Sequence, residues 1–122
     1  MNKYQEAIDD ANFNATLNNI TNCNFTSGTV EALLDESFIA QHGKPNKIIV
    51  DPPRAGLHQK VIDVFLQELP PTIVYVSCNP VTQARDIALL AEKYKVVKSQ
   101  AFDLFPHTYH VENIVLLQLK ED

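Results

Sequence analysis

The stretch Ile-Val-Tyr-Val-Ser-Cys-Asn-Pro, residues 73–80, joins an apolar run to the start of a helix. The apolar residues at its beginning are typical of a buried strand, which Thr72 extends by one residue. Asn79 is a favourable N-cap and Pro80 suits the first helical position, so the helix is expected to begin at Pro80. The stretch therefore predicts a strand-to-helix turn that carries Cys78.

Strand and helix patterns alternate on both sides of this turn, and the last two strand-like segments follow each other without a helix between them. Such alternation indicates a mostly parallel sheet built by crossover helices, with an antiparallel strand at its C-terminal end. We expect an α/β fold of about five strands with helices on both faces. The predicted helices cover about 4–18, 30–38, 58–69 and 80–93, and the predicted strands cover 23–26, 47–50, 72–77, 96–102 and 111–119.

Composition narrows the class of protein. The chain has 122 residues, of which 45% are hydrophobic, so a single domain over residues 1–122 is expected. It shows neither a secretory signal nor a membrane-spanning run, and we expect a cytoplasmic protein with no membrane partner. Cys23 and Cys78 have no metal-ligand spacing, so no metal site is expected. The net charge of −5 argues against a freestanding nucleic-acid-binding module.

Cys78 lies beside the positive end of a predicted helix dipole, a position that favours the nucleophilic thiolate. A second loop of interest, Asp-Pro-Pro-Arg at residues 51–54, follows the strand at 47–50. Its prolines stiffen the turn and leave the carboxylate of Asp51 at its base. From local sequence alone, Cys78 could be an inert packed thiol, as most lone cysteines are, and Asp51 could simply cap nearby amides.

A third loop, residues 105–112, crowds aromatic, imidazole and carboxylate groups between the last two strands. Glu112 enters an apolar strand and could act as a general base, or it could belong to a solvated hairpin tip. Parallel strands that end at Val50 and Ser77 place Asp51 and Cys78 at one carboxyl edge of the sheet, where open α/β sheets bind ligands. A final antiparallel strand would begin at that edge and bring Glu112 there.

Together these residues resemble the RNA uracil-C5 methyltransferases, which use S-adenosylmethionine on tRNA or rRNA. The resemblance covers nearly the whole chain and is carried by Asp-Pro-Pro-Arg-Ala-Gly-Leu at 51–57, by Val-Tyr-Val-Ser-Cys-Asn-Pro at 74–80 with Ala-Arg-Asp at 84–86, and by Asp-Leu-Phe-Pro at 103–106 leading to His-Val-Glu at 110–112. The order and spacing of these segments match together.

The resemblance implies a covalent mechanism. Cys78 would be the nucleophile that adds to C6 of uracil, and Glu112 the general base that later removes the C5 proton. Asp51 would contact the cofactor S-adenosyl-L-methionine, and Arg54 is a candidate for positioning the RNA substrate. The target base would have to leave its stack to reach such a site.

The resemblance also implies a truncated, Rossmann-like class I methyltransferase sheet. The family's glycine-rich cofactor turn has no counterpart in the sequence, Thr29 stands where many relatives carry Asp, and His107 where Gln is commoner. We therefore expect the C-terminal part of a catalytic domain that is inactive in isolation. In the absence of two strands, the segment at 23–26 is expected to pair directly with that at 47–50, and the last strand to insert beside residues 72–77.

Two other functions stay open at this stage. The Asp-Pro-Pro segment also occurs in amino-group methyltransferases that act on adenine or cytosine, although these usually place a stacking aromatic residue where Arg54 stands. The missing cofactor turn would also be consistent with a non-catalytic interaction domain that retains the fold. The joint presence of Cys78 and Glu112 favours the uracil-C5 enzyme over both.

Overall fold

The structure is a computed structural model that describes residues 3–103 and 111–121. The chain divides into two compact units, Met1–Asp35 and Glu36–Asp122. The first unit contains the helices α1 (Lys3–Leu17) and α2 (Val30–Leu33). The long helix predicted near the N-terminus is therefore confirmed, with its bounds shifted by one residue.

The strand predicted at residues 23–26 is wrong. The structure assigns no strand to this segment, and all of its side chains are exposed. A strand must pair its backbone donors and acceptors with a neighbour, and this segment has no ladder in the described part of the chain. The predicted pairing with residues 47–50 is therefore wrong as well, because in the described sheet that strand lies at the edge and pairs with residues 72–77 alone.

The helix predicted at 30–38 forms as two helices. Leu34 has φ −84° and ψ 71°, outside the helical region, so α2 stops at Leu33. A separate helix, α3, covers Glu36–His42 in the second unit. Local backbone geometry at Leu34 thus interrupts a pattern that is apolar enough for one helix.

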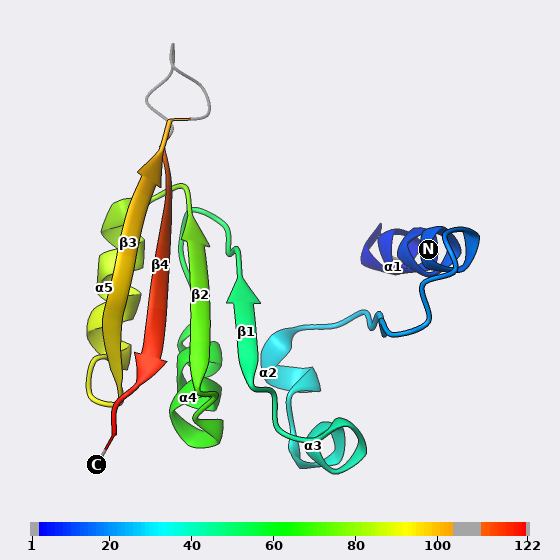
Figure 1. Ribbon diagram of the computed structural model, residues 1–122, viewed down its shortest axis with the longest axis horizontal. Helices are drawn as coiled ribbons and strands as arrows, with labels where there is room; N and C mark the ends of the chain where they lie inside the picture. The colour runs from blue at the N-terminus through cyan, green and yellow to red at the C-terminus, as the bar shows by residue number, and fades with distance from the viewer. Residues whose placement is uncertain (1–2, 104–110, 122) are drawn as a thin grey trace. The chain divides into compact units, whose positions relative to one another are not determined.

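The second unit alternates strands and helices as the sequence predicts. Its sheet contains four strands rather than five, in the order β1-β2-β4-β3 (Figure 1). Strand β1 pairs in parallel with β2, and β4 lies antiparallel between β2 and β3. The predicted insertion of the last strand beside residues 72–77 is confirmed. The elements after α3 are β1 (Lys47–Val50), α4 (Gln59–Glu68), β2 (Thr72–Ser77), α5 (Pro80–Leu90), β3 (Tyr94–Phe102) and β4 (Glu112–Leu119).

Helices α4 and α5 lie on the same face of this sheet (Figure 1). Each crossover moves the chain in the same direction across the sheet, and right-handed connections then place both helices on one side. The core forms beneath them, where Ile73 and Tyr75 of β2 are opposite Leu117 and Val115 of β4. Helices on both faces were expected, whereas within this unit α4 and α5 share one.

The other face of the sheet is more open. Side chains of Val74 and Val76 are half-buried there, and Ile49 of β1 is 73% exposed. No helix in the described part of the chain is long and apolar enough to cross a membrane. The open face leads to the carboxyl edge of β1 and β2, where the candidate site lies.

Candidate active site

Three of the four predicted site residues lie at the carboxyl edge of the parallel strands, at the ends of three successive strands of the sheet. Asp51 follows the last residue of β1, Cys78 follows the last residue of β2, and Glu112 is the first residue of β4. The register aligns Ser77 of β2 with Asn113 of β4, which brings the start of β4 to the end of β2. The topology therefore places all three residues at one edge, as the strand order requires.

A pocket of about 430 Å³ opens at this edge. It is lined by the carboxylates of Asp51 and Glu112 and by apolar side chains of Val76, Phe102 and Ile114. Cys78 is not among its described lining residues. The pocket thus combines apolar walls with two acidic groups, a composition suited to a flat polar ligand.

Glu112 carries the most unusual group in the pocket. Its side chain is half-buried, and its Oε2 atom is fully buried without a hydrogen-bond partner among the described residues. Buried polar atoms are normally paired, because an unpaired one costs about 1–3 kcal/mol. Among the described residues this oxygen thus lacks a protein donor, and it belongs to a residue that lines the pocket.

The turn around Cys78 is tightly organised. The side-chain oxygen of Asn79 accepts the backbone N–H groups of Val81 at 3.1 Å and Thr82 at 3.4 Å, which caps α5. Ser77 accepts the backbone N–H of Asn79 at 2.9 Å. The predicted helix start at Pro80 is confirmed, and Cys78, a free and half-buried thiol, lies one residue before this cap.

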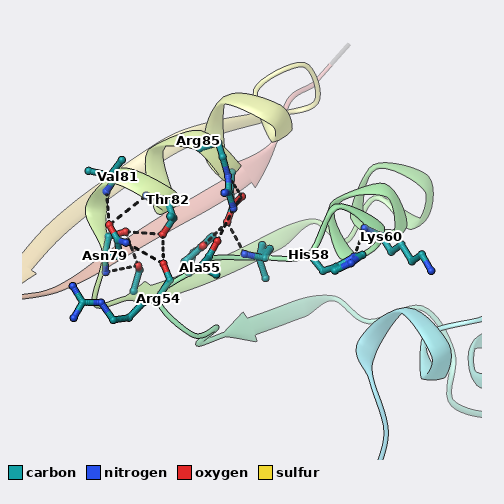
Figure 2. Close-up of polar contacts among 12 residues, drawn as sticks. Arg54, Ala55, His58, Lys60, Asn79, Val81, Thr82 and Arg85 are labelled. Carbon is teal, nitrogen blue, oxygen red and sulfur yellow. Dashed lines mark hydrogen bonds and ion pairs between the residues drawn. The ribbon is translucent and has the colours of Figure 1, made fainter.

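The loop that contains Asp51 and Arg54 is held by the same helix. Both side chains are exposed, but the carbonyl oxygen of Arg54 accepts hydrogen bonds from the Asn79 amide at 3.0 Å and the Thr82 hydroxyl at 2.8 Å (Figure 2). The loop is therefore fixed through its backbone, which leaves the side chains of Asp51 and Arg54 available for a ligand.

Sequence reasoning missed the residue that anchors the end of this loop. Asp86 of α5 is only 1% exposed, and it accepts the Leu57 backbone N–H at 2.7 Å and the Tyr75 hydroxyl at 2.6 Å. Burial, together with the hydrogen bond to Asp86, raises the pKa of Tyr75 far above its usual value, so this hydroxyl remains a donor. The sequence did contain an indication that Asp86 is buried, because Gln83, Asp86 and Leu90 share one face of the predicted helix.

Gln83 is the second missed residue. It is 1% exposed, and its amide donates to the backbone oxygens of Tyr75 and Asn113, each at 3.1 Å. The Asn113 amide donates in return to the Gln83 side-chain oxygen at 2.7 Å. Gln83 thus joins α5 to β2 and to the residue that follows Glu112.

Part of the predicted site lies outside the described residues. The segment at 104–110 includes Phe105, Pro106, His107 and His110, which belong to the motif that leads to Glu112. Among the described residues, no cluster of three or more His, Cys, Asp or Glu side chains could hold a metal ion. The site is therefore described here by Asp51, Cys78 and Glu112 and the groups around them.

These features define an α/β domain with a mixed four-stranded sheet and a pocket at the carboxyl edge of its parallel strands. The model of one family, tRNA (Uracil-5-)-methyltransferase, matches residues 4–120. The chain belongs to this family, and the resemblance seen in the sequence is confirmed.

Similar proteins agree with this assignment. An uncharacterised RNA methyltransferase of Bacteroides thetaiotaomicron is 58% identical over 115 residues, which are 94% of this chain and 25% of that protein. Another, from Porphyromonas gingivalis, is 56% identical over 92% of this chain and 24% of its own length. The chain therefore spans about a quarter of the curated relatives that it matches.

A solved structure is similar as well. The tRNA (uracil-54, C5)-methyltransferase of Pyrococcus abyssi, in complex with S-adenosyl-L-homocysteine, matches with a TM-score of 0.77 and 39% sequence identity. The match covers 93% of this chain and 26% of that one. The likeness thus extends over almost all of this chain and a minor part of the archaeal enzyme.

Proposed function

We propose that this chain is the C-terminal part of the catalytic domain of an S-adenosylmethionine-dependent RNA methyltransferase, which methylates C5 of uridine in tRNA or rRNA. The observation that carries the proposal is the pocket shared by Asp51 and the unpaired Glu112 oxygen, on the edge where Cys78 also lies. Family membership supports it. Because the chain spans about a quarter of its relatives, we expect it to be inactive alone.

The residues at the edge fit the cofactor and base that this reaction needs. When bound, S-adenosylmethionine supplies an electrophilic methyl group. Asp51 would hold the cofactor, because an exposed carboxylate in the pocket can accept hydrogen bonds from its amino or hydroxyl groups. The apolar side chains of Val76, Phe102 and Ile114 suit the faces of a flat ring.

Cys78 starts the reaction on the base. Its thiolate forms a bond to C6 of uracil, and the electron pair of the C5–C6 double bond moves towards the C4 carbonyl as an enolate. C5 would then be nucleophilic enough to take the methyl group, whose bond to the cofactor sulfur would break with S-adenosylhomocysteine as the leaving group. The turn supports this role because it holds Cys78 beside the capped, positive end of α5.

Glu112 completes the reaction. C5 now carries both the methyl group and its original proton, and the carboxylate of Glu112 removes that proton. The C5–C6 double bond forms again as the bond from C6 to sulfur breaks, which returns the thiolate. An unpaired carboxylate oxygen suits this task, because no protein donor competes for it among the described residues.

The test uses a hybrid enzyme in which this chain replaces the matching 115 residues of the Bacteroides thetaiotaomicron relative. The hybrid is incubated with labelled cofactor and uridine-containing RNA, and modified nucleosides are identified by mass spectrometry. We expect 5-methyluridine from the hybrid and none from this chain alone. A methylated adenine or cytosine amino group would instead support the amino-group enzyme, and no methylation with intact folding would support an interaction domain.

Three variants test the covalent step in the hybrid. Cys78→Ala should abolish methylation and form no RNA adduct. Glu112→Gln should accumulate an adduct that survives denaturation, because elimination needs the base. Cys23→Ala changes the other free thiol of the chain and should act like the unaltered hybrid. Full activity in the Cys78→Ala hybrid would overturn the covalent mechanism.

A further inference from the structure

Helix α5 and its N-cap contact the backbone of residues 54–57 in the loop between β1 and α4. Asn79 and Thr82 bind the carbonyl oxygen of Arg54, and the Arg85 guanidinium donates to the carbonyl oxygen of Ala55 at 2.8 Å (Figure 2). These contacts involve no side chain of the loop. They fix the backbone of the loop and leave its side chains available for other contacts.

Asp86 is the centre of this arrangement. One of its oxygens, Oδ2, accepts from Leu57 and Tyr75, and the other, Oδ1, accepts from Arg85 Nε at 3.2 Å and Nη2 at 3.0 Å. A buried carboxylate is tolerated when donors satisfy it in this way. Asp86 therefore binds the end of the loop directly and orients the arginine that binds its middle.

The loop backbone approaches Asp86 as closely as a glycine allows. Gly56 has φ +85°, and a Cβ atom at this position would lie 2.6 Å from Asp86 Oδ2 and 2.7 Å from Arg85 Nη2. Such a distance leaves no room for a side chain. The contact between the loop and α5 is therefore built around the carboxylate, with the glycine as its counterpart.

We propose that Asp86 is a positioning residue, which holds the loop of Asp51 and Arg54 in a fixed place relative to Cys78. The inference deepens the proposed function and rests on it. Cys78 lies immediately before α5, and Asp86 lies on α5, so one rigid helix sets both the nucleophile and the loop. If Asp86 acts in this way, its loss lowers cofactor binding and turnover by moving Asp51, although Asp86 itself is buried and is not one of the residues that line the pocket.

The test compares substitutions around this carboxylate in the hybrid enzyme described above. Asp86→Asn replaces one acceptor oxygen by an NH₂ group, which is a donor and cannot accept the hydrogen bond from either Arg85 or Leu57. Arg85→Ala removes the contact to the middle of the loop together with the ion pair to Asp86 Oδ1, and since Arg85 is 52% exposed this variant should fold even if Asp86→Asn does not. Tyr75→Phe removes a donor from the sheet side and leaves the loop contacts in place. Asp63→Asn, on the exposed side of α4, is the matched control for the change of charge.

Four quantities are measured for each variant. They are the melting temperature, the cofactor Kd by calorimetry, kcat, and the rate of hydrogen exchange in the peptide that contains Leu57. We expect Asp86→Asn to raise the cofactor Kd at least tenfold, to lower kcat at least tenfold, and to speed exchange at Leu57 at least tenfold. Arg85→Ala should cause about threefold changes in the same direction. Tyr75→Phe should lower the melting temperature while its Kd and kcat stay within about twofold, and Asp63→Asn should change nothing.

A merely structural role predicts a different pattern, in which Kd and kcat follow the melting temperature in both Asp86→Asn and Tyr75→Phe. That result, or a folded Asp86→Asn enzyme with unchanged Kd and kcat, would overturn the proposal. Failure of the proposed function has another signature, because the unaltered hybrid would then methylate no uridine even though exchange at Leu57 still accelerates in Asp86→Asn. In that case Asp86 anchors the loop for some other purpose, and its role as a positioning residue for methylation is overturned too.

Discussion

Asp51, which follows β1, and Glu112, which begins β4, line the same pocket although a strand lies between their own strands. Strand β2 separates them, and its half-buried Val76 forms part of the pocket wall. Because β4 runs antiparallel to β1 and β2, its first residue reaches the edge where the parallel strands end. The inserted last strand therefore brings a second acidic residue, Glu112, to the pocket that Asp51 lines.

Glu112→Gln should separate activity from stability in the hybrid enzyme. The variant loses the base, and general acid–base catalysis contributes about 10²–10⁴-fold, so we expect methylation to fall by at least about 100-fold. The free energy of unfolding should stay unchanged or rise by up to about 1 kcal/mol, because an amide costs less to bury unpaired than a carboxylate. Methyl transfer assays and urea unfolding measure the two quantities.

The control for this variant is Glu68→Gln on α4, which removes the same charge away from the pocket. It should leave methylation and stability nearly unchanged. A loss of more than about 1 kcal/mol in Glu112→Gln would contradict the finding that Glu112 Oε2 has no hydrogen-bond partner among the described residues.

Gly56→Ala should destabilise the second unit more than Gly43→Ala. Both glycines have positive φ, +85° and +80°, so each alanine incurs a similar backbone strain of about 1 kcal/mol. Only at position 56 does the new Cβ meet Asp86 and Arg85, whereas at position 43 it meets nothing within 4 Å. We expect urea unfolding to show an additional loss of about 1–3 kcal/mol for Gly56→Ala. Equal losses would indicate that the loop moves away from Asp86 without cost.

Strands β1 and β2 could be predicted because each is an apolar run with clear boundaries, whereas β3, whose side chains are mostly exposed, begins at Tyr94, two residues before its predicted start. Strands β1 and β2 have the predicted bounds, and the capped turn at Asn79 fixes the start of α5. The segment at 23–26 could not be assigned in the same way, since a short, polar run becomes a strand only when a partner satisfies its backbone. Whether such a partner exists depends on tertiary structure, and local sequence does not reveal it.

The candidate site likewise has a part that could be predicted from the sequence and a part that could not. Asp51, Cys78 and Glu112 could be predicted to share an edge because strand direction alone determines which ends meet. The anchoring contacts of Asp86 and Gln83 could not, because they depend on hydrogen bonds between segments about thirty residues apart. Two buried polar residues on the inner face of α5 indicate that such partners exist, but not which backbone groups they are.

Substitutions of Asn79 should distinguish its two functions, capping α5 and holding Arg54. Asn79→Asp keeps an acceptor for the N–H groups of Val81 and Thr82, but it loses the amide that donates to the Arg54 carbonyl. Asn79→Ala loses both. We expect urea unfolding to show a loss of about 1–2 kcal/mol for Ala and a smaller loss for Asp, because Asp is as good a cap as Asn. Hydrogen exchange in the loop at 51–57 should accelerate in both variants; slow exchange in Asn79→Asp would mean that Thr82 holds Arg54 alone.

Tyr94 should make the fold sensitive to alkali. Its hydroxyl is buried and donates to the Pro70 carbonyl at 2.6 Å, and burial raises the pKa of Tyr94 from 10.0 to about 12. Above pH 10 the unfolded chain releases this proton while the folded chain keeps it, so stability is full below pH 10 and falls as pH rises towards 12. A two-unit difference corresponds to a loss of up to about 2.7 kcal/mol.

In Tyr94→Phe the stability at pH 9 should be lower by about 1 kcal/mol, because the Pro70 carbonyl loses its donor, but the further decline between pH 10 and 12 should be shallower. Tyr75, whose pKa is also raised, adds the same decline to both proteins. Urea unfolding at several pH values measures the two slopes, and equal slopes would show that Tyr94 ionises as easily in the folded chain as in the unfolded one.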